Sequence, residues 1–365
     1  MKIEQLKNTN QILLFLFLII TGLYLGAALF IPLTFAVFLA TLVFPFVRFL
    51  EKRTRMKKVS SSFVGTFVVF LGVGLLMFFF IQQLSLFLQD IIESRRQIVF
   101  YLKELHERAT GITGFSLQQQ DEFLKNSLLG IVNFTQSYVA NFLAQIGTLL
   151  FNFLLILILI FLLLLNRDKF TLFLSMYTRK EHQLETKEIV DQIRQVAHKY
   201  LWGRIQVMSV LALMYFILFT AYDLRHTGLL IIFGALITII PYIGPFISGV
   251  VPIIFIIMFD GSSTEIISFT IIITIVQLIE SYVLEPILIG SEVEQSPLFI
   301  ILAIIVGGMI WGPAGLILFV PLFSILKIFF DHTEGLKPVG FLVGYERPGS
   351  SEGIIEKIKR KLMNN

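Results

Sequence analysis

Four polar residues that could carry chemistry lie in one apolar stretch, VQLIESYVLEPILIG, at residues 276–290: Gln277, Glu280, Ser281 and Glu285. Spacings of three and four residues place Gln277, Glu280 and Ser281 on one face of a helix. Removal from water disfavours the free charged form of a carboxyl group, so a buried carboxyl readily accepts a proton or a cation. The pattern therefore predicts a proton or coupling-ion site.

The surroundings of these acids restrict where they can lie. No Lys or Arg occurs between Arg225 and Lys327. A charge at the bilayer centre costs about 2.5–3.5 kcal/mol, and two lipid-facing acids would cost roughly 5–7 kcal/mol. The acids must face a cavity, a partner group or the membrane interface, or be protonated. The alternative to a functional site is that Glu285 lies at the membrane boundary and Glu280 is hydrogen-bonded within a helix bundle.

The composition around this stretch is that of a membrane protein. Of the 365 residues 56% are hydrophobic and only 15% are charged, against roughly 25% charged in soluble proteins. Because about 20 apolar residues cross a bilayer, long runs without Asp, Glu, Lys or Arg predict spans. Such runs occupy residues 11–47, 59–89, 126–166, 205–222, 227–259, 266–279 and 295–326. We expect an all-α, polytopic integral membrane protein with about eight transmembrane segments.

The positions of the basic residues predict the topology. Residues 48–58 hold six basic residues and one acid, and the stretches 166–204 and 327–365 are also rich in Lys and Arg. By the positive-inside rule these regions and the N-terminus are cytoplasmic. The expected membrane helices are 11–30, 33–50 after a turn at Pro32, 59–86, 146–165 and 203–222. Tyr200 and Trp202 are typical of an interfacial aromatic belt.

We divide the chain accordingly into a membrane region (1–88), an extracytoplasmic amphipathic region (89–147), a fourth membrane helix (148–165), a cytoplasmic amphipathic linker (166–202), a C-terminal region with broken helices (203–330) and a basic tail (331–365).

Apolar residues spaced by three and four predict amphipathic helices at 84–108, from about 117 onward and at 178–200. We expect them to extend membrane helices and pack on one another or on neighbouring subunits. A ligand sensor or a docking site for a partner is the alternative.

Two long apolar segments are interrupted by proline and glycine. Residues 228–259 would form one helix of roughly 48 Å, too long to span without severe tilt. Pro241, Gly244 and Pro245 lie at its centre, which favours a hairpin of two half-helices meeting at PYIGP. The second segment, 297–325, is broken by Gly307, Gly308, Gly312 and Pro313.

Paired interruptions of this kind indicate a binding site in a transporter. Irregular backbone at membrane depth is tolerated where protein buries it or where it lines a water-filled cavity. The hypothesis is that the two breaks meet around a wet pocket that the acids help to line. The alternative is ordinary proline kinks packed against neighbours. Whether each broken segment spans the membrane or forms a re-entrant hairpin remains open at this point.

Several classes of function lack their sequence signatures. The chain has no cysteine and no HExxH, G-x-S-x-G, Walker or Rossmann motif. We expect no enzyme activity, no cofactor and no metal site. No folded basic surface for nucleic acid is evident.

Four stretches resemble the AI-2E (autoinducer-2 exporter) family of bacterial permeases. They are IPLTFAVFLATLVFPFVRFLEKR, YLWGRIQ, IIPYIGPFISGVVP and, most specifically, QLIESYVLEPILIGSEVEQSPLFIILAIIVGGMIWGPAGLILFVPLFSILK at residues 277–327. The resemblance implies a multi-pass transporter of the plasma membrane with both termini in the cytoplasm, and a homo-oligomer. It places Pro241, Gly244, Gln277, Glu280, Glu285, Pro286, Gly290, Gly307, Gly308, Gly312 and Pro321 in the family's pattern.

The resemblance implies export of a small polar metabolite or signal such as autoinducer-2, driven by a gradient. Na+(Li+)/H+ antiport through the same acids is the first alternative. A non-transporting membrane scaffold is the second. The expected partners are a small-molecule or ion substrate, the lipid bilayer and further copies of the chain.

Overall fold

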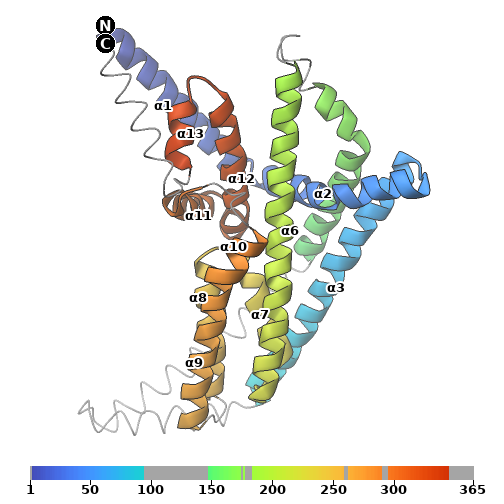
Figure 1. Ribbon diagram of the computed structural model, residues 1–365, viewed down its shortest axis with the longest axis vertical. Coiled ribbons are helices and arrows are strands. Elements are labelled where there is room, and N and C mark those ends of the chain that lie inside the picture. Colours follow the sequence, from blue (N-terminus) through green and yellow to red (C-terminus); the bar gives the residue numbers. More distant parts are fainter. Residues whose placement is uncertain are drawn as a thin grey trace.

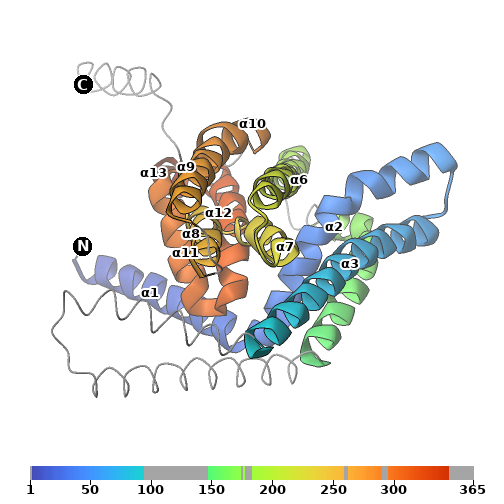
Figure 2. The same cartoon turned by 90° about the horizontal axis from the view of Figure 1, so that it is seen from below.

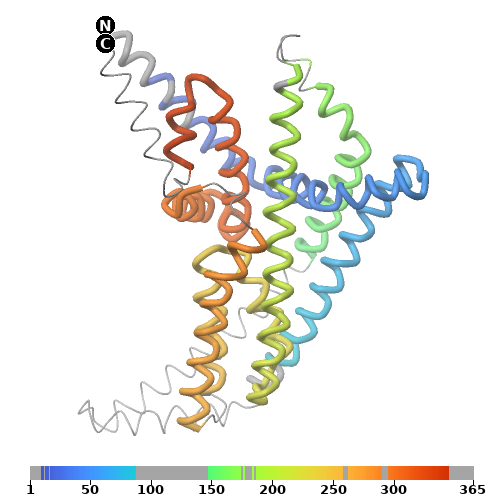
Figure 3. Tube along the Cα trace, viewed as in Figure 1, coloured from blue at the N-terminus to red at the C-terminus, as the bar shows by residue number. Residues whose placement is uncertain are grey.

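The computed structural model describes residues 2–93, 147–173, 176, 183–258, 262–289 and 295–344 (Figure 3). Every long element in these ranges is a helix, and the only β-pairing there is an isolated bridge between Gln295 and Gly344. The prediction of an all-α protein is confirmed. The predicted amphipathic helix from residue 117 and the basic end of the tail lie outside the described residues.

The N-terminal membrane region consists of α1 (Lys2–Leu25), α2 (Ala27–Thr54), α3 (Lys58–Glu93) and an unlabelled helix, Gly147–Phe173. The predicted turn at Pro32 is wrong, because Pro32 lies inside α2 and the chain breaks at Gly26. The Phe30 ring lies where a Cβ on Gly26 would point, so the break falls at a residue without a side chain. Pro32 is the sixth residue of α2, beyond the first four N–H groups that lack intrahelical partners, so the helix continues through it with one backbone hydrogen bond missing.

The longest helix of the described residues is α6 (Gln183–Ala221), which joins the predicted cytoplasmic linker to the predicted membrane helix 203–222. Over residues 183–200 the linker therefore extends a membrane helix, as expected. In Figures 1 and 2, α2, α3 and the helix Gly147–Phe173 lie on one side of α6 and the C-terminal helices on the other. This central helix contacts both halves of the molecule.

The first broken segment is a helical hairpin, as the sequence favoured. It comprises α7 (Thr227–Ile237) and α8 (Ile243–Met258), joined by a turn that contains Pro241 and Tyr242. Tyr242 has a φ of 63°, which is uncommon for a residue other than glycine. With 11 residues α7 is roughly 17 Å long, too short to cross a bilayer core of about 30 Å.

The C-terminal part continues with α9 (Ser263–Ile279), a π-helical turn η2 (Glu280–Leu284) and α10 (Glu285–Leu288). A second hairpin follows, formed by α11 (Pro297–Trp311) and α12 (Pro313–His332), and α13 (Lys337–Val343) ends the described chain. Both broken segments are thus hairpins. In Figure 1, α7, α8 and α9 lie beside the lower part of α6, and α12 lies beside its upper part.

Six of the described helices are long and apolar enough to cross a membrane, and four shorter apolar helices accompany them. The long ones are Ala27–Thr54, Lys58–Phe87, Gly147–Phe173, Thr186–Ala221, Ser263–Leu288 and Pro313–His332. Many of their Leu, Ile and Phe side chains are exposed on the outside of the bundle. Lipid is the solvent that suits such surfaces, so the chain is a polytopic membrane protein.

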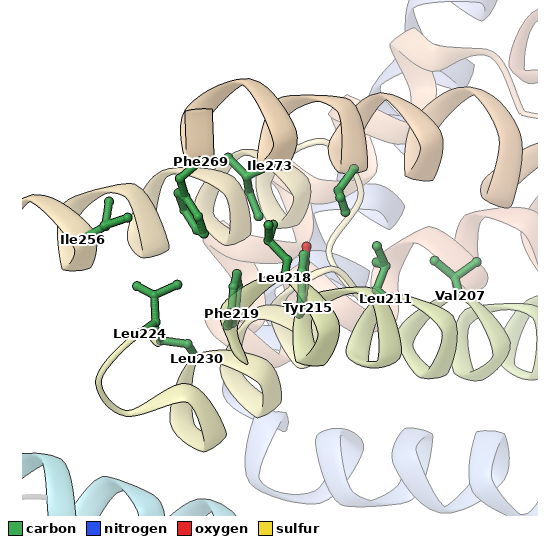
Figure 4. Packing of buried hydrophobic residues seen from close by; sticks show 11 residues of the cluster. Val207, Leu211, Tyr215, Leu218, Phe219, Leu224, Leu230, Ile256, Phe269 and Ile273 are labelled. Carbon is green, nitrogen blue, oxygen red and sulfur yellow. The ribbon is translucent and has the colours of Figure 1, made fainter. Parts of the chain in front are cut away.

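Three apolar clusters hold the helices together. One joins α2, α3 and the helix Gly147–Phe173, and a second joins α2, α6, the α7–α8 turn, α11 and α12. The third lies between α6, α7, α8 and α9, with the Tyr215 ring stacked on Phe219 at 5.2 Å (Figure 4). The hydroxyl group of Tyr215 brings a polar atom into this apolar interior.

Candidate functional site

The candidate acids lie where α9 changes its helical geometry. Glu280 begins the π-turn η2, whose wider winding is closed by a bond from the Glu285 N–H to the Glu280 carbonyl. Pro286 follows directly and has no N–H for the preceding turn, so the regular ladder is interrupted there. Single π-turns within α-helices occur often at functional sites. This irregular turn separates Glu280 from Glu285 and gives each carboxyl group a different environment.

Glu280 is fully buried, with 0% of its surface exposed. Its Oε2 lies 2.9 Å from the terminal amide of Gln277, and its Oε1 has no hydrogen-bond partner among the described residues. Beyond the amide lie the hydroxyl groups of Tyr215 and Ser248, both themselves fully buried. Four polar side chains from α6, α8, α9 and η2 therefore form one cluster, the polar cluster, inside the apolar bundle.

The polar cluster is joined to the first hairpin through α8. The Tyr215 hydroxyl donates to Ser248 Oγ at 3.1 Å, and Ser248 Oγ donates to the Pro245 carbonyl at 3.1 Å. The Gln277 amide lies 3.3 Å from the same carbonyl. Because a buried polar group without a partner is costly, these bonds hold the start of α8 against α6 and α9.

Glu285 has a different partner, Arg204 of α6. The Arg204 Nη1 donates to Glu285 Oε1 at 2.6 Å and to the Thr238 carbonyl, in the turn of the first hairpin, at 3.3 Å. Arg204 is 4% exposed, and its guanidinium lies 5.8 Å from the centre of the Tyr200 ring. Arg204 belongs to the basic stretch 166–204, whose composition predicts a cytoplasmic location but does not predict this pairing. Of the two residues of the predicted interfacial belt, Tyr200 is buried at 3% exposure and Trp202 is exposed at 49%.

Close backbone contacts shape the first hairpin. A Cβ on Gly244 would collide with the Ile237 carbonyl and the Thr238 Cα, so the two arms can meet only at a glycine. Pro241 lies in the turn, and its carbonyl accepts the Ile243 N–H at 2.7 Å. Of the predicted residues, Gln277, Glu280, Glu285 and Pro245 are thus brought together around this hairpin. Ser281 is exposed, and its hydroxyl group is not a member of the hydrogen-bonded set around Glu280.

The second hairpin is built by glycine in the same manner but has apolar surroundings. A Cβ on Gly307 or Gly315 would overlap the backbone of the opposite arm, and Gly312 has a φ of 57° at the turn. Pro313 starts α12, where a missing N–H costs nothing. The Trp311 Nε1 donates to the Leu23 carbonyl of α1 at 3.0 Å.

Among the described residues, no hydrogen bond joins this second hairpin to Glu280 or Glu285. The backbone bonds of Gly312 remain within α11 and α12. The two hairpins share an apolar cluster that includes Ile240 of the first turn and Trp311 of the second. The acids therefore belong with the first break, and the contact between the breaks is apolar.

Comparison with known proteins decides the family. Residues 13–335 match the profile described as "AI-2E family transporter". The chain belongs to the AI-2E family.

Individual relatives of this AI-2E chain are distant. It is 24% identical over 331 residues to the "AI-2 transport protein TqsA" of Escherichia coli (strain K12), covering 90% of this chain and 93% of that relative. It is 24% identical over 316 residues to the "Putative transport protein YueF" of Bacillus subtilis (strain 168), covering 83% and 84%. The match to YrrI of the same organism is 32% identical but spans only 36% of this chain and 37% of that relative.

As an AI-2E family member the chain is a membrane transporter, which engages a substrate and the lipid around it. Most of the positions that the resemblance singled out lie at the two hairpins or at η2. Gly290 lies outside the described residues. Arg204, Tyr215 and Ser248 complete the polar environment of the acids. Two of them lie in stretches that carry the resemblance, Arg204 in YLWGRIQ and Ser248 in IIPYIGPFISGVVP, whereas Tyr215 lies in none of the four.

Proposed function

We propose that this AI-2E chain is a gradient-driven secondary transporter of the bacterial plasma (inner) membrane that exports a small polar metabolite or signal, such as autoinducer-2. The observation that carries the proposal is the Glu280 carboxyl group, which is fully buried in an apolar bundle and contacts the Gln277 amide next to α8. Ionisable groups at this depth are costly and mark ion or proton pathways. The name of TqsA, an AI-2 transport protein, supports the cargo.

The first hairpin is the proposed moving element. Its turn is linked to α10 through Arg204, which bonds both the Thr238 carbonyl and Glu285, and the start of α8 is held through Ser248 and Pro245. Hairpins that do not span the bilayer can shift against neighbouring helices and open a path on alternate sides. Loading a proton on Glu280 would change the charge beside this hairpin, and thereby bias its position.

Unpartnered polar atoms support a polar cargo. The Oε1 atom of Glu280 and the Nε atom of Arg204 are buried without a hydrogen-bond partner among the described residues. One is an acceptor and the other a donor, and both adjoin the first hairpin. An uncharged solute rich in hydroxyl groups, once admitted by movement of the hairpin, would satisfy both.

The second candidate is Na+(Li+)/H+ antiport. Three oxygen-bearing groups support it: the Glu280 Oε2 atom, the Gln277 amide at 2.9 Å from it and the Pro245 carbonyl at 3.3 Å from that amide. With the amide oxygen turned toward the carboxylate, three oxygens would face one point. Hard cations are bound by carboxylate and carbonyl oxygens, so an alkali cation would compete there with a proton.

Everted membrane vesicles distinguish the two candidates. Efflux predicts uptake of labelled autoinducer-2 into the vesicles, dependent on the proton gradient and lost in Glu280→Gln. Antiport predicts sodium-dependent dequenching of a pH-sensitive dye that the same substitution abolishes. Thr274→Ala, which removes an exposed hydroxyl on α9, is the matched control. Unchanged transport in Glu280→Gln would overturn the coupling role of Glu280 in both forms of the proposal. Absence of either activity in wild-type vesicles would favour the scaffold alternative.

The remaining parts of the proposal concern placement. We propose cytoplasmic N- and C-termini by the positive-inside rule, because Lys2 and Lys7 lie at the N-terminus and the stretch 327–365 is rich in Lys and Arg. We also propose a homo-oligomer, because exposed apolar faces such as that of α3 can be covered by a second copy as well as by lipid. Crosslinking in native membranes tests the oligomer, and a monomer under those conditions contradicts it.

A further inference from the structure

The Gln277 amide is the one group that touches every other member of the polar cluster. One end of the amide lies 3.0 Å from the Tyr215 hydroxyl and 3.2 Å from Ser248 Oγ. The other end lies 2.9 Å from Glu280 Oε2 and 3.3 Å from the Pro245 carbonyl. The oxygen and nitrogen of an amide have nearly the same size, so a half-turn exchanges them without moving any other heavy atom.

One orientation suits an ionised Glu280. The amide nitrogen then donates to Glu280 Oε2 and to the Pro245 carbonyl. The amide oxygen accepts from Tyr215 and Ser248, and it lies 3.3 Å from the Gly249 N–H. In this arrangement α9 holds two backbone groups of α8, namely the Pro245 carbonyl and the Gly249 N–H.

The opposite orientation suits a protonated Glu280. The carboxyl O–H then donates to the amide oxygen, and the amide nitrogen donates to Tyr215 and Ser248. The Tyr215 hydroxyl then donates its hydrogen bond to Ser248 Oγ, and the Ser248 hydroxyl donates to the Pro245 carbonyl. Without the proton, this orientation would bring three acceptor oxygens together with no hydrogen between them. The proton on Glu280 is therefore what permits it.

We propose that Gln277 is a positioning residue whose amide turns by half a rotation when Glu280 gains or loses a proton, and that this turn tightens or releases the start of α8. The inference deepens the proposed proton coupling and rests on it. Protonation removes the amide's hydrogen bonds to both backbone groups of α8, and the bond to Ser248 is then its one remaining hydrogen bond to that helix. A charge change on η2 is thereby converted into a change in how firmly the first hairpin is held.

Among the described residues, few charged groups other than Glu280 lie near enough to reorient the Gln277 amide. Glu285 and Arg204 act electrostatically on the Glu280 carboxyl, the first from α10 and the second from α6. They are paired with each other at 2.6 Å, so their opposite charges offset one another. The facing side chains of α6 and α8 in the polar cluster, Tyr215 and Ser248, are neutral. Protonation of Glu280 is therefore the change in charge that occurs closest to the Gln277 amide.

Infrared difference spectroscopy of the purified protein in lipid nanodiscs tests the switch. Acidification should produce a carboxyl C=O band that Glu280→Gln removes. The ring C–O band of Tyr215, identified by its loss in Tyr215→Phe, should shift with the same midpoint, because Tyr215 changes from donor alone to donor and acceptor. Tyr282→Phe, at an exposed tyrosine of the same π-turn, should leave that shift intact. A carboxyl band that titrates while the Tyr215 band stays fixed would overturn the inference.

A second variant separates the amide from the carboxyl group. Gln277→Met keeps the length of the side chain and removes the amide. We expect the Glu280 band to persist and the pH-dependent Tyr215 shift to be lost, whereas a Tyr215 shift that still follows Glu280 would contradict the role of the amide. If Gln277→Met fails to fold, isotope labelling of the glutamine amides in the wild type supplies the same readout. Vesicle transport is measured separately, so a switch without proton-driven transport would refute only the proposed function.

Discussion

Arg204 of α6 and Glu285 of α10 form an ion pair, with 2.6 Å between Nη1 and Oε1, and the same Nη1 also donates to the Thr238 carbonyl of the first hairpin. The Arg204 side chain is 5% exposed and that of Glu285 is 30% exposed. The pair therefore has one buried and one partly accessible partner. These contacts join α6, α10 and the turn of the first hairpin, which are separated by tens of residues in the sequence. The charge of Glu285 is tolerated in an apolar segment because Arg204 neutralises it.

The first prediction concerns this ion pair. Arg204→Met should destabilise the protein by about 2–4 kcal/mol, since it leaves a carboxylate and a backbone carbonyl without their donor; the partial exposure of Glu285 keeps the cost below that of a fully buried pair. Adding Glu285→Gln to Arg204→Met should recover part of the loss. Denaturant unfolding in detergent measures both. Wild-type stability of the single variant would show that the pair contributes little.

The second prediction compares two replacements of Glu280. Glu280→Gln should stay within about 1 kcal/mol of the wild type, because its amide can donate to or accept from Gln277. Glu280→Leu should lose about 1–3 kcal/mol, because it leaves the buried Gln277 amide without that partner. Thermal unfolding of both variants provides the test. Equal stability of the two variants would mean that the contact between Gln277 and Glu280 contributes nothing to the free energy of unfolding.

Part of this site could be predicted from the sequence, and the reason is local spacing. The interval between residues 277 and 280 predicts that the two side chains meet on one helical face, and the length of the segment around PYIGP predicts a hairpin. Arg204, Tyr215 and Ser248 could not be predicted in the same way. They reach the site from helices 29 to 81 positions away in the sequence, and no periodicity encodes such pairings.

The hypothesis that both breaks surround one wet pocket illustrates the same limit. Glycine and proline spacing identifies where a chain can fold back, but not which side chains fill the space between two turns. In the structure Ile240 and Trp311 belong to one apolar cluster there. The break at Gly26 was missed for a related reason. Proline was expected to mark the turn, whereas the helix breaks at a glycine against which the Phe30 ring packs.

The third prediction concerns the second hairpin. Gly315→Ala would place a Cβ on the backbone of Gly307, which cannot rotate away as a side chain could. We expect a loss of about 1–3 kcal/mol or more, typical of overpacking. Gly74→Ala is the matched control, since a Cβ there meets nothing within 4 Å and alanine favours a helix by about 0.5–1 kcal/mol. The unfolding midpoints of the two variants, measured in the same detergent, should shift in opposite directions from the wild type. An unchanged midpoint for Gly315→Ala would contradict the close contact.

The fourth prediction concerns the path of the first hairpin through the bilayer. An arm of 11 residues does not cross, so the chain should enter and leave the hairpin on the same side of the membrane. Ala221 precedes the hairpin and Ser263 follows it, and both are exposed.

The absence of cysteine from the chain makes labelling direct. Ala221→Cys and Ser263→Cys should react with a membrane-impermeant maleimide added to intact cells. Arg53→Cys, at the basic end of α2, should react only in everted vesicles. If Ala221→Cys and Ser263→Cys were labelled from opposite sides, the segment would span the membrane. The α7–α8 turn could then not serve as the re-entrant gate beside Glu280, because its two arms would be fixed on different faces of the bilayer.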